Sequence, residues 1–482
     1  MAEFNGNFLR KLRIAKKMSQ TELAIMLGIS NRAVSKWETE LSSPSSKNIF
    51  RLANIFSVSV DSFFEDSYDR SDALSSVKPR YMESMIELYK IGRGPSSSHT
   101  IGPERACSIF KDKKPTADSF KVILYGSLAK TGKGHGTDDV IKKTIAPKNC
   151  AIEFNLVDDI IPHPNTMELY AYANDKEIDF ARVFSVGGGS IVFEGEHKNK
   201  QVDSIYPYNS FRDIAEYCKN NEIRLWQYAL EIEGEALQEH IARVWKTMNS
   251  SIKRGLADYG ELPGGLGVKK KAKVLYSSQH IDESSETKES RLVCAYAFAV
   301  SEQNASGETI ATAPTCGSAG VLPAVLYYQQ QKHGFPDEKM HRALITAGII
   351  GNLIKTNASI SGAECGCQAE IGTACAMAAA ALAELFELDI EKIEYAAEIA
   401  IEHHLGLTCD PICGLVQIPC IERNAVAAMR AINALSLANF LADSSKISFD
   451  MVVKVMYETG KNLLSDYRET ASGGLAKHYK NH

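Results

Sequence analysis

The spacing of apolar residues changes along the chain and separates three regions. In residues 8–65 the apolar positions recur three or four residues apart, as in Phe8 and Leu12 or Val34 and Trp37, which predicts a run of short helices. Between about residues 81 and 225, strand-like runs such as FKVILYGS and ARVFSVGGGSIVFEG alternate with helical or loop segments, which is typical of an α/β or α+β domain. From about residue 226 onward the helical spacing returns and strand candidates become scarce.

The first region has clear signals for the start and end of helices. Ser19, followed three residues later by Glu22, forms a capping-box pattern; Gly28 ends that helix, and Ser30 can cap the next. This helix, glycine turn and second helix resemble the repressor-type (XRE/Cro-like) helix-turn-helix family. The resemblance implies that the second helix enters the major groove of DNA. The residues it assigns to DNA are Asn31, Arg32, Ser35 and Lys36 at the bases and Gln20 at a phosphate. A small helical bundle used for dimerisation is the alternative.

A polar stretch rich in Ser and Asp, EDSYDRSDALSSVKPR, follows the helical region and predicts a linker. A chain of 482 residues has room for about three domains at roughly 100–200 residues each. We therefore expect a multidomain α and α/β protein. The predicted parts are a small all-α helix-turn-helix head at 1–66, the linker at 67–80, an α+β domain at 81–225 and a largely all-α domain at 226–482.

Charge is distributed unevenly between the head and the rest of the chain. Residues 1–58 hold nine Lys/Arg against four Asp/Glu, and the remaining residues hold 45 against 55. A basic head and an acidic body indicate different functions. The basic residues near the N-terminus are not followed by an uninterrupted apolar run, and the most apolar stretch, residues 371–386, is too short to span a bilayer. We therefore expect a cytoplasmic protein without a membrane span.

Eleven cysteines in a chain without an export signal argue against a disulfide scaffold. Five of them lie within one 56-residue stretch: Cys365, Cys367, Cys409, Cys413 and Cys420. They include no CxxC pair, which disfavours a zinc ribbon. Three thiolates from separate loops could hold a [4Fe–4S] cluster that leaves one iron open for a substrate, and buried free thiols are the alternative.

Six passages, in the right order, resemble the iron–sulfur-dependent L-serine dehydratase (L-serine ammonia-lyase) family over about residues 81–475. They are PSSSHTIGP, GHGTDD, QNASGETIATAPTCGSAG, GAECGCQAEIG, LTCDPICGLVQIPCIERN and SGGLA. The resemblance implies a [4Fe–4S] cluster held by Cys367, Cys409 and Cys420. We interpret Cys365, Cys375 and Cys413 as packing residues.

The resemblance also implies the reaction, which is loss of water from L-serine followed by hydrolysis of the released aminoacrylate to pyruvate and ammonia. A neutral histidine suits removal of the Cα proton, because its pKa lies near working pH. The family indicates His99 and His135, and we favour His99 for contact with the substrate. The side chains expected to bind the substrate carboxylate are Ser96, Ser97, Ser98 and Thr100, together with Asn304 and Ser306.

Three functions from different classes follow from these patterns. The first is a working serine dehydratase, expected to be a homodimer, with a head that binds DNA. The second is a transcription regulator whose dehydratase-like body senses serine or oxygen. The third is a pyridoxal-phosphate lyase, since SIKRG (251–255) resembles the lysine motif of that family. In that family the lysine precedes the glycine run, whereas here it follows Gly187–Gly189, so we expect no pyridoxal phosphate. The intact cysteines and histidines favour the first function.

Overall fold

The computed structural model describes residues 4–16, 18–39, 41–56, 63, 82–156, 162–195, 205–278, 282–470 and 473–479. Contacts between residues divide the chain into two compact units, residues 1–79 and 80–482. The predicted linker lies outside the described residues. The predicted boundary near residue 225 stays a prediction, because the sheet and the large helical region belong to one unit. Among the described helices, none has the length and apolar character needed to cross a bilayer.

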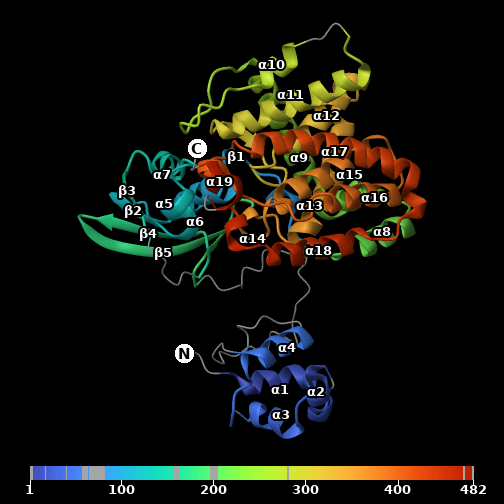
Figure 1. The fold of residues 1–482 in the computed structure, drawn as a ribbon. Helices are drawn as coiled ribbons and strands as arrows, with labels where there is room; N and C mark the ends of the chain where they lie inside the picture. The colour runs from blue at the N-terminus through green and yellow to red at the C-terminus, as the bar shows by residue number, and fades with distance from the viewer. Residues whose placement is uncertain are drawn as a thin grey trace. The chain divides into compact units, whose positions relative to one another are not determined.

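The first unit consists of short helices, as the apolar spacing predicts (Figure 1). They are α1 (Gly6–Ala15), α2 (Gln20–Leu27), α3 (Asn31–Glu38) and α4 (Ser46–Phe56). Ser19 and Glu22 form the predicted capping box at the start of α2, and the side chain of Ser30 caps α3. Gly28 ends α2 with a φ of 66°, a left-handed conformation that glycine adopts without a steric penalty.

A mixed five-stranded sheet forms one part of the second unit, and its strand order is β3-β2-β4-β5-β6. The strands are β2 (Ser119–Leu124), β3 (Asn149–Phe154), β4 (Thr166–Ala173), β5 (Lys176–Gly187) and β6 (Ser190–Phe193). Neighbouring strands are antiparallel except β2 and β3, which are parallel. A parallel pair needs a crossover connection, and α6 (Gly126–Thr131) and α7 (Thr137–Ile145) supply it. This crossover carries His135 between its two helices.

Helices pack against the sheet through a core of their own. The helix α5 (Gly102–Lys113) contributes Phe110 to this core, α6 contributes Leu128 and α7 contributes Ile141, and all three side chains are buried against the strands. Immediately before α5, residues Ser97–Ile101 form a single π-helical turn, η3. Such turns are rare in proteins, and those that occur are often found at functional sites.

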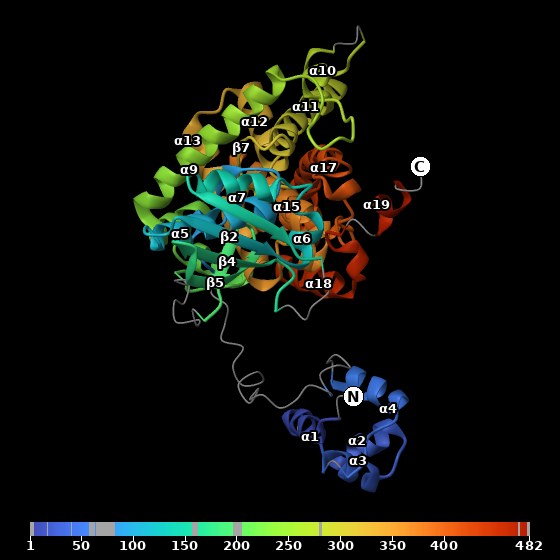
Figure 2. The ribbon, with the colours of Figure 1, turned by 90° about the vertical axis from the view of Figure 1, so that its left-hand side faces the viewer.

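The rest of the second unit is largely helical, as predicted, and lies to one side of the sheet (Figures 1 and 2). Its helices are α8 (Phe211–Asn220), α9 (Leu225–Ala257), α10 (Ala272–Ser277), α11 (Ser285–Ala305), α12 (Val321–His333), α13 (Asp337–Asn357), α14 (Gly362–Cys365), α15 (Thr373–Leu385), α16 (Ile390–Glu402), α17 (Cys420–Leu441), α18 (Phe449–Asn462) and α19 (Gly474–Tyr479). The alanine-rich α15 is buried at every position and packs against α12, α13, α16 and α17. The small side chains of α15 allow these neighbours to approach closely.

A short two-stranded ladder joins distant parts of this unit. The strand β1 (Ile91–Arg93) pairs antiparallel with β7 (Thr309–Ala311), and Arg93 lies opposite Thr309. The ladder holds the loop that contains PSSSHTIGP beside the segment that contains Asn304 and Ser306. Two of the passages on which the family resemblance depends therefore lie side by side.

Candidate active site

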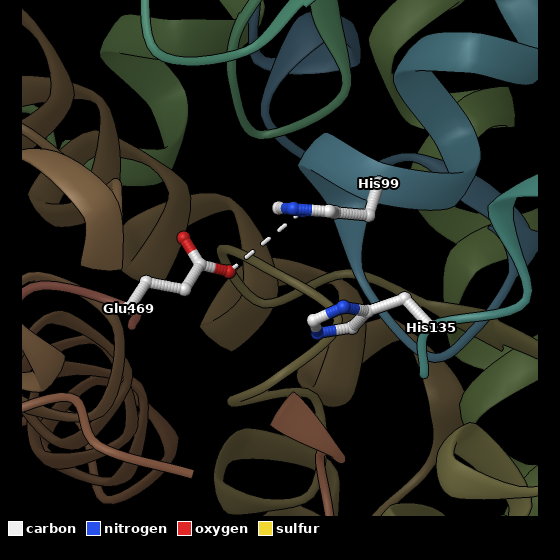
Figure 3. A group of neighbouring side chains, drawn as sticks. All are labelled: His99, His135 and Glu469. Atoms are coloured by element: carbon white, nitrogen blue, oxygen red, sulfur yellow. Dashed lines mark ion pairs between the residues drawn. The ribbon is translucent and has the colours of Figure 1, made fainter. Parts of the chain in front are cut away.

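The two predicted histidines lie together in the folded chain (Figure 3). Their ring centroids are 4.4 Å apart and their planes differ by 29°. His99 lies in the π-helical turn η3 and His135 in the loop between α6 and α7. Both side chains are buried, with exposed fractions of 0% and 1%.

Hydrogen bonds assign a neutral tautomer to His99. The hydroxyl of Thr131 donates to the carbonyl of Ser127 at 2.9 Å, so its oxygen accepts from Nε2–H of His99, also at 2.9 Å. The Nδ1 atom of His99 then accepts from the Ser98 hydroxyl at 2.9 Å. Burial and the neighbouring His135 hold the pKa of His99 well below its usual value. Both nitrogens of this ring therefore have partners within the protein.

His135 differs because one of its nitrogens has no partner. Its Nδ1 atom lies 2.9 Å from the carbonyl oxygen of Thr131 and must donate to it. Its Nε2 atom is buried and forms no hydrogen bond with any described residue. Burial lowers the pKa of His135 to about 4. The ring is therefore neutral near pH 7, and the lone pair on Nε2 is free to accept a proton.

The predicted carboxylate-binding hydroxyls are buried and form hydrogen bonds inside the protein. Ser97 accepts from the backbone N–H of Cys316 at 2.8 Å, and Thr100 donates to the Arg93 carbonyl at 3.0 Å. Ser96 and Ser98 both lie beside Nδ1 of His99. In this arrangement the four side chains order the loop around His99. Their role in substrate binding stays a prediction.

Asn304 and Ser306 present polar atoms that are buried and unpaired among the described residues. Asn304 donates from Nδ2 to the carbonyl of Pro95 at 2.9 Å, whereas its Oδ1 atom and the Ser306 hydroxyl have no partner there. A buried polar atom without a partner costs free energy, so such atoms mark a position where a ligand or water binds.

A pocket of about 290 Å³ lies beside this region. Its walls come from five separate segments of the chain and include His135 and Ser306, whereas Asn304 is not one of the lining residues. The lining residues are Arg93, Gly94, Pro95, Lys133, Gly134, His135, Gly136, Asp139, Val140, Lys143, Pro263, Gly264, Ala305, Ser306, Gly307, Leu415, Val416 and Gln417. This volume lies near the lower end for small-molecule sites.

The three predicted cluster ligands come from separate segments. Cys367 follows α14, Cys409 lies in the loop after α16, and Cys420 begins α17. The Sγ atoms of Cys367 and Cys409 and a carboxylate oxygen of Glu370 lie within 4.8 Å of one another. The charges of Cys367, Cys420 and Cys409 raise the pKa of the Arg423 guanidinium, so all three cysteines interact with this cation.

This donor set fits a soft metal group. Hydrogen bonding from Cys409 and the charge of Arg423 lower the pKa of Cys367, and metal binding requires thiolates. Cys367 and Cys409 are buried and Cys420 is half-buried. Three cysteines suit an iron–sulfur cluster with one open position better than a structural zinc site, which is closed by four ligands.

The other cysteines of this region test the packing interpretation. Cys365 and Cys375 are buried, the first against Gly460 and the second with its thiol donating to the carbonyl of Ala427. Cys413 is exposed and has a φ of 55° in the loop before Cys420. The interpretation of Cys413 as a packing residue is therefore wrong: the left-handed turn directs this position to solvent.

Glu469 is a residue of the site that the sequence patterns did not single out. Its carboxylate lies 3.9 Å from Nδ1 of His99 (Figure 3). Its backbone N–H donates to the carbonyl of Cys409 at 2.8 Å, which ties the C-terminal segment to the cysteine loop. Burial, followed by the charge of Glu370, raises the pKa of Glu469 to about 8. The one feature of the sequence that could have indicated Glu469 is its position just before the SGGLA motif.

The predicted DNA-contacting residues gather on and beside α3. Asn31, Arg32 and Lys36 are exposed, and Ser35 is half-buried. Arg32 and Lys36 form no ion pair with any described residue. The other predicted contacts are engaged within the head: Gln20 donates to Glu38 at 2.7 Å, and Asn31 donates to Thr21 at 3.0 Å.

Comparison with known proteins agrees with this arrangement. Residues 166–476 match the family model described as serine dehydratase alpha chain, residues 84–151 match serine dehydratase beta chain, and residues 9–63 match a helix-turn-helix model. L-serine dehydratase from Haemophilus influenzae is 39% identical over 449 residues, which cover 82% of this chain and 99% of the relative. L-serine dehydratase 2 from Escherichia coli is 39% identical, covering 82% and 98%, and the Streptomyces coelicolor enzyme is 38% identical, covering 82% and 98%. The chain belongs to the L-serine dehydratase family and carries a helix-turn-helix domain at its N-terminal end.

Proposed function

We propose that this protein dehydrates L-serine to pyruvate and ammonia. The observation that carries the proposal is the buried Nε2 atom of His135: the ring is neutral, this nitrogen has no partner among the described residues, and His135 is one of the residues that line a small pocket. A base in that state is suited to remove a weakly acidic Cα proton. The relatives named L-serine dehydratase supply the substrate.

We also propose a [4Fe–4S] cluster with Cys367, Cys409 and Cys420 as its ligands. When bound, it would supply a Lewis-acidic iron that stabilises the departing hydroxyl group. We assign no role to pyridoxal phosphate. Lys253 is exposed on α9. Gly187 ends β5, and Gly188 and Gly189 form the turn to β6; all three glycines have positive φ.

In the proposed reaction His135 is the base, although the sequence favoured His99 for contact with the substrate. Nε2 of His135 accepts the Cα proton; the electrons of the broken C–H bond form the double bond of aminoacrylate as the hydroxyl leaves. Thr131 orients both rings, because its carbonyl accepts from His135 and its hydroxyl accepts from His99. The Oδ1 atom of Asn304 suits the substrate ammonium, and the Ser306 hydroxyl suits its carboxylate.

The proposal is tested by anaerobic reconstitution of the full chain with iron and sulfide, followed by measurement of pyruvate formed from L-serine. We expect Cys409→Ala to lose both the iron and the activity. The matched control is Cys375→Ala, which changes a buried cysteine outside the site and should keep both. Wild-type activity in Cys409→Ala would refute the cluster, and a wild-type preparation with iron and no pyruvate would refute the dehydratase.

We propose in addition that the head binds DNA through α3. Support comes from Arg32 and Lys36, two exposed cations on that helix without an ion pair to any residue that the structure describes, and from the match to the helix-turn-helix model. In a mobility-shift assay at low salt, Arg32→Ala and Lys36→Ala should weaken binding more than Arg10→Ala, which removes an exposed cation from α1. Absence of DNA binding by the wild-type chain would favour the alternative in which the head is a helical bundle used for dimerisation. A chain that binds DNA and serine without releasing pyruvate would favour the alternative in which the protein is a transcription regulator that senses serine.

A further inference from the structure

The pocket that contains His135 has a positively charged mouth that the dehydration chemistry does not use. Arg93, Lys133 and Lys143 line it with exposed side chains, against a single acidic lining residue, Asp139. Within the described parts of the chain, none of the three cations has a side-chain hydrogen bond or ion pair. Arg93 ends β1, Lys133 lies two residues before His135, and Lys143 lies on α7. Three separate elements therefore direct unpaired cations to one opening.

Asp139 does not neutralise this mouth. It lies four residues before Lys143 on α7, so the two side chains share one face of the helix. One carboxylate against three cations leaves the lining with a net positive charge. A cleft lined by one sign of charge raises the local concentration of ligands of the opposite sign.

Two residues of the pocket lining carry a buried polar atom. These atoms are Nε2 of His135 and the hydroxyl of Ser306, and neither has a partner among the described residues. The volume of about 290 Å³ limits the ligand to a small molecule with some water. The three cations and the small volume of the pocket thus favour a compact anion.

We propose that Arg93, Lys133 and Lys143 form a binding subsite for the carboxylate of small monocarboxylate anions, and that the keto acid product occupies it. This inference rests on the proposed function. A monoanion is attracted by the net positive charge, whereas serine also carries an ammonium group that the same field repels. The mouth therefore favours pyruvate over serine, and pyruvate inhibits the enzyme competitively.

The test compares the variant Lys133→Gln/Lys143→Gln with Lys142→Gln, which removes an exposed lysine of α7 outside the pocket lining. Calorimetric titration of the full chain with pyruvate at low salt should give about tenfold weaker binding in the double variant and an unchanged Kd in the control. Added salt should weaken binding to the wild type more than to the double variant. Arg93→Gln, measured in the same way, provides a second route if the double variant does not fold.

Inhibition by pyruvate is followed through ammonia release, and its inhibition constant should rise by a larger factor than the KM for serine. Wild-type affinity for pyruvate in the double variant, or an equal loss in Lys142→Gln, would overturn the subsite. A wild-type chain that binds pyruvate in this way and releases no ammonia from serine would remove the dehydratase proposal and leave the subsite standing. The two proposals thus fail separately.

Discussion

His99 and His135 stack with their ring centroids 4.4 Å apart, and both form hydrogen bonds with Thr131. The bonds have opposite consequences for the two rings. His99 uses both nitrogens inside the protein, because Nε2 donates to Thr131 and Nδ1 accepts from Ser98. His135 donates through Nδ1, and its Nε2 atom has no partner in the described part of the chain. Two histidines of similar burial therefore differ in their hydrogen bonding, and in the proposed reaction His135 accepts the proton while His99 helps to position His135.

Replacing His135 should affect the chemical step more than replacing His99. We expect His135→Asn to lower kcat for serine by about 10²- to 10⁴-fold, because it removes the free lone pair that accepts the proton. His99→Asn should lower kcat less, since that ring acts through its neighbours. Ammonia release by the reconstituted variants, normalised to bound iron, measures both effects. A larger loss in His99→Asn would reverse the assignment.

The low pKa of His135 makes stability depend on pH. Its pKa is about 4 in the folded chain and near 6.5 in the unfolded chain, so the unfolded state binds the proton more readily. The contribution of His135 to the free energy of unfolding is therefore fully present above pH 6.5 and is lost as the pH falls toward 4. Between pH 7 and pH 5 this residue should account for about 2 kcal/mol of lost stability. Urea unfolding at the two pH values should show a smaller loss in His135→Asn than in the wild type.

Much of the fold follows from local signals in the sequence. Ser19 with Glu22 and the glycine at position 28 predict both ends of α2, because capping and left-handed turns are properties of a few adjacent residues. The change of apolar spacing near residue 226 predicts the helical region. The pairing of β1 with β7 had no such signal. It joins segments more than 200 residues apart, and tertiary packing selects it.

The candidate site was only partly predictable, for a related reason. Motifs identify residue types, so His99, His135 and the three cysteines could be named from the sequence. Hydrogen-bond partners depend on geometry, and the sequence could not show that Thr131 leaves only His135 with a free nitrogen. Glu469 approaches His99 because the C-terminal segment returns to the Cys409 loop. Cys413 is exposed because its backbone turns left-handed, which its side chain does not favour and which sequence spacing does not reveal.

The ion pair between Arg224 and Glu384 should contribute to the stability of the helical region. Arg224 donates to both carboxylate oxygens of Glu384, at 2.8 and 3.1 Å, and the Glu384 side chain is only 3% exposed. Arg224→Ala should destabilise the protein by about 2–3 kcal/mol, because it leaves the buried carboxylate without a cation and with only the Thr346 hydroxyl as a side-chain donor, although Arg224 is itself 31% exposed. Burial raises the pKa of Glu384, so protonation at low pH should reduce this loss.

Urea unfolding at pH 8 and pH 5 measures the effect of Arg224→Ala. The double variant Arg224→Met/Glu384→Leu is the matched control, since it removes both charges and should cost less than the single change. A single variant with wild-type stability at pH 8 would show that Glu384 finds another partner.

Position 94 should tolerate only glycine without a loss of stability, because Asn304 occupies the space that a side chain would need. A Cβ atom at this position would overlap the carbonyl oxygen and Oδ1 of Asn304, whereas one at Gly92 would meet only the tip of Ile101 at 3.1 Å. We expect Gly94→Ala to destabilise the protein by about 1–3 kcal/mol and Gly92→Ala to cost less. The displaced Asn304 would lose its bond to Pro95, and in the proposed reaction it would no longer be in position to bind the substrate. KM for serine should therefore rise in Gly94→Ala and stay near the wild-type value in Gly92→Ala. Steady-state kinetics and urea unfolding of both variants check this. A destabilised Gly94→Ala with wild-type KM would mean that Asn304 supports the fold without contacting the substrate.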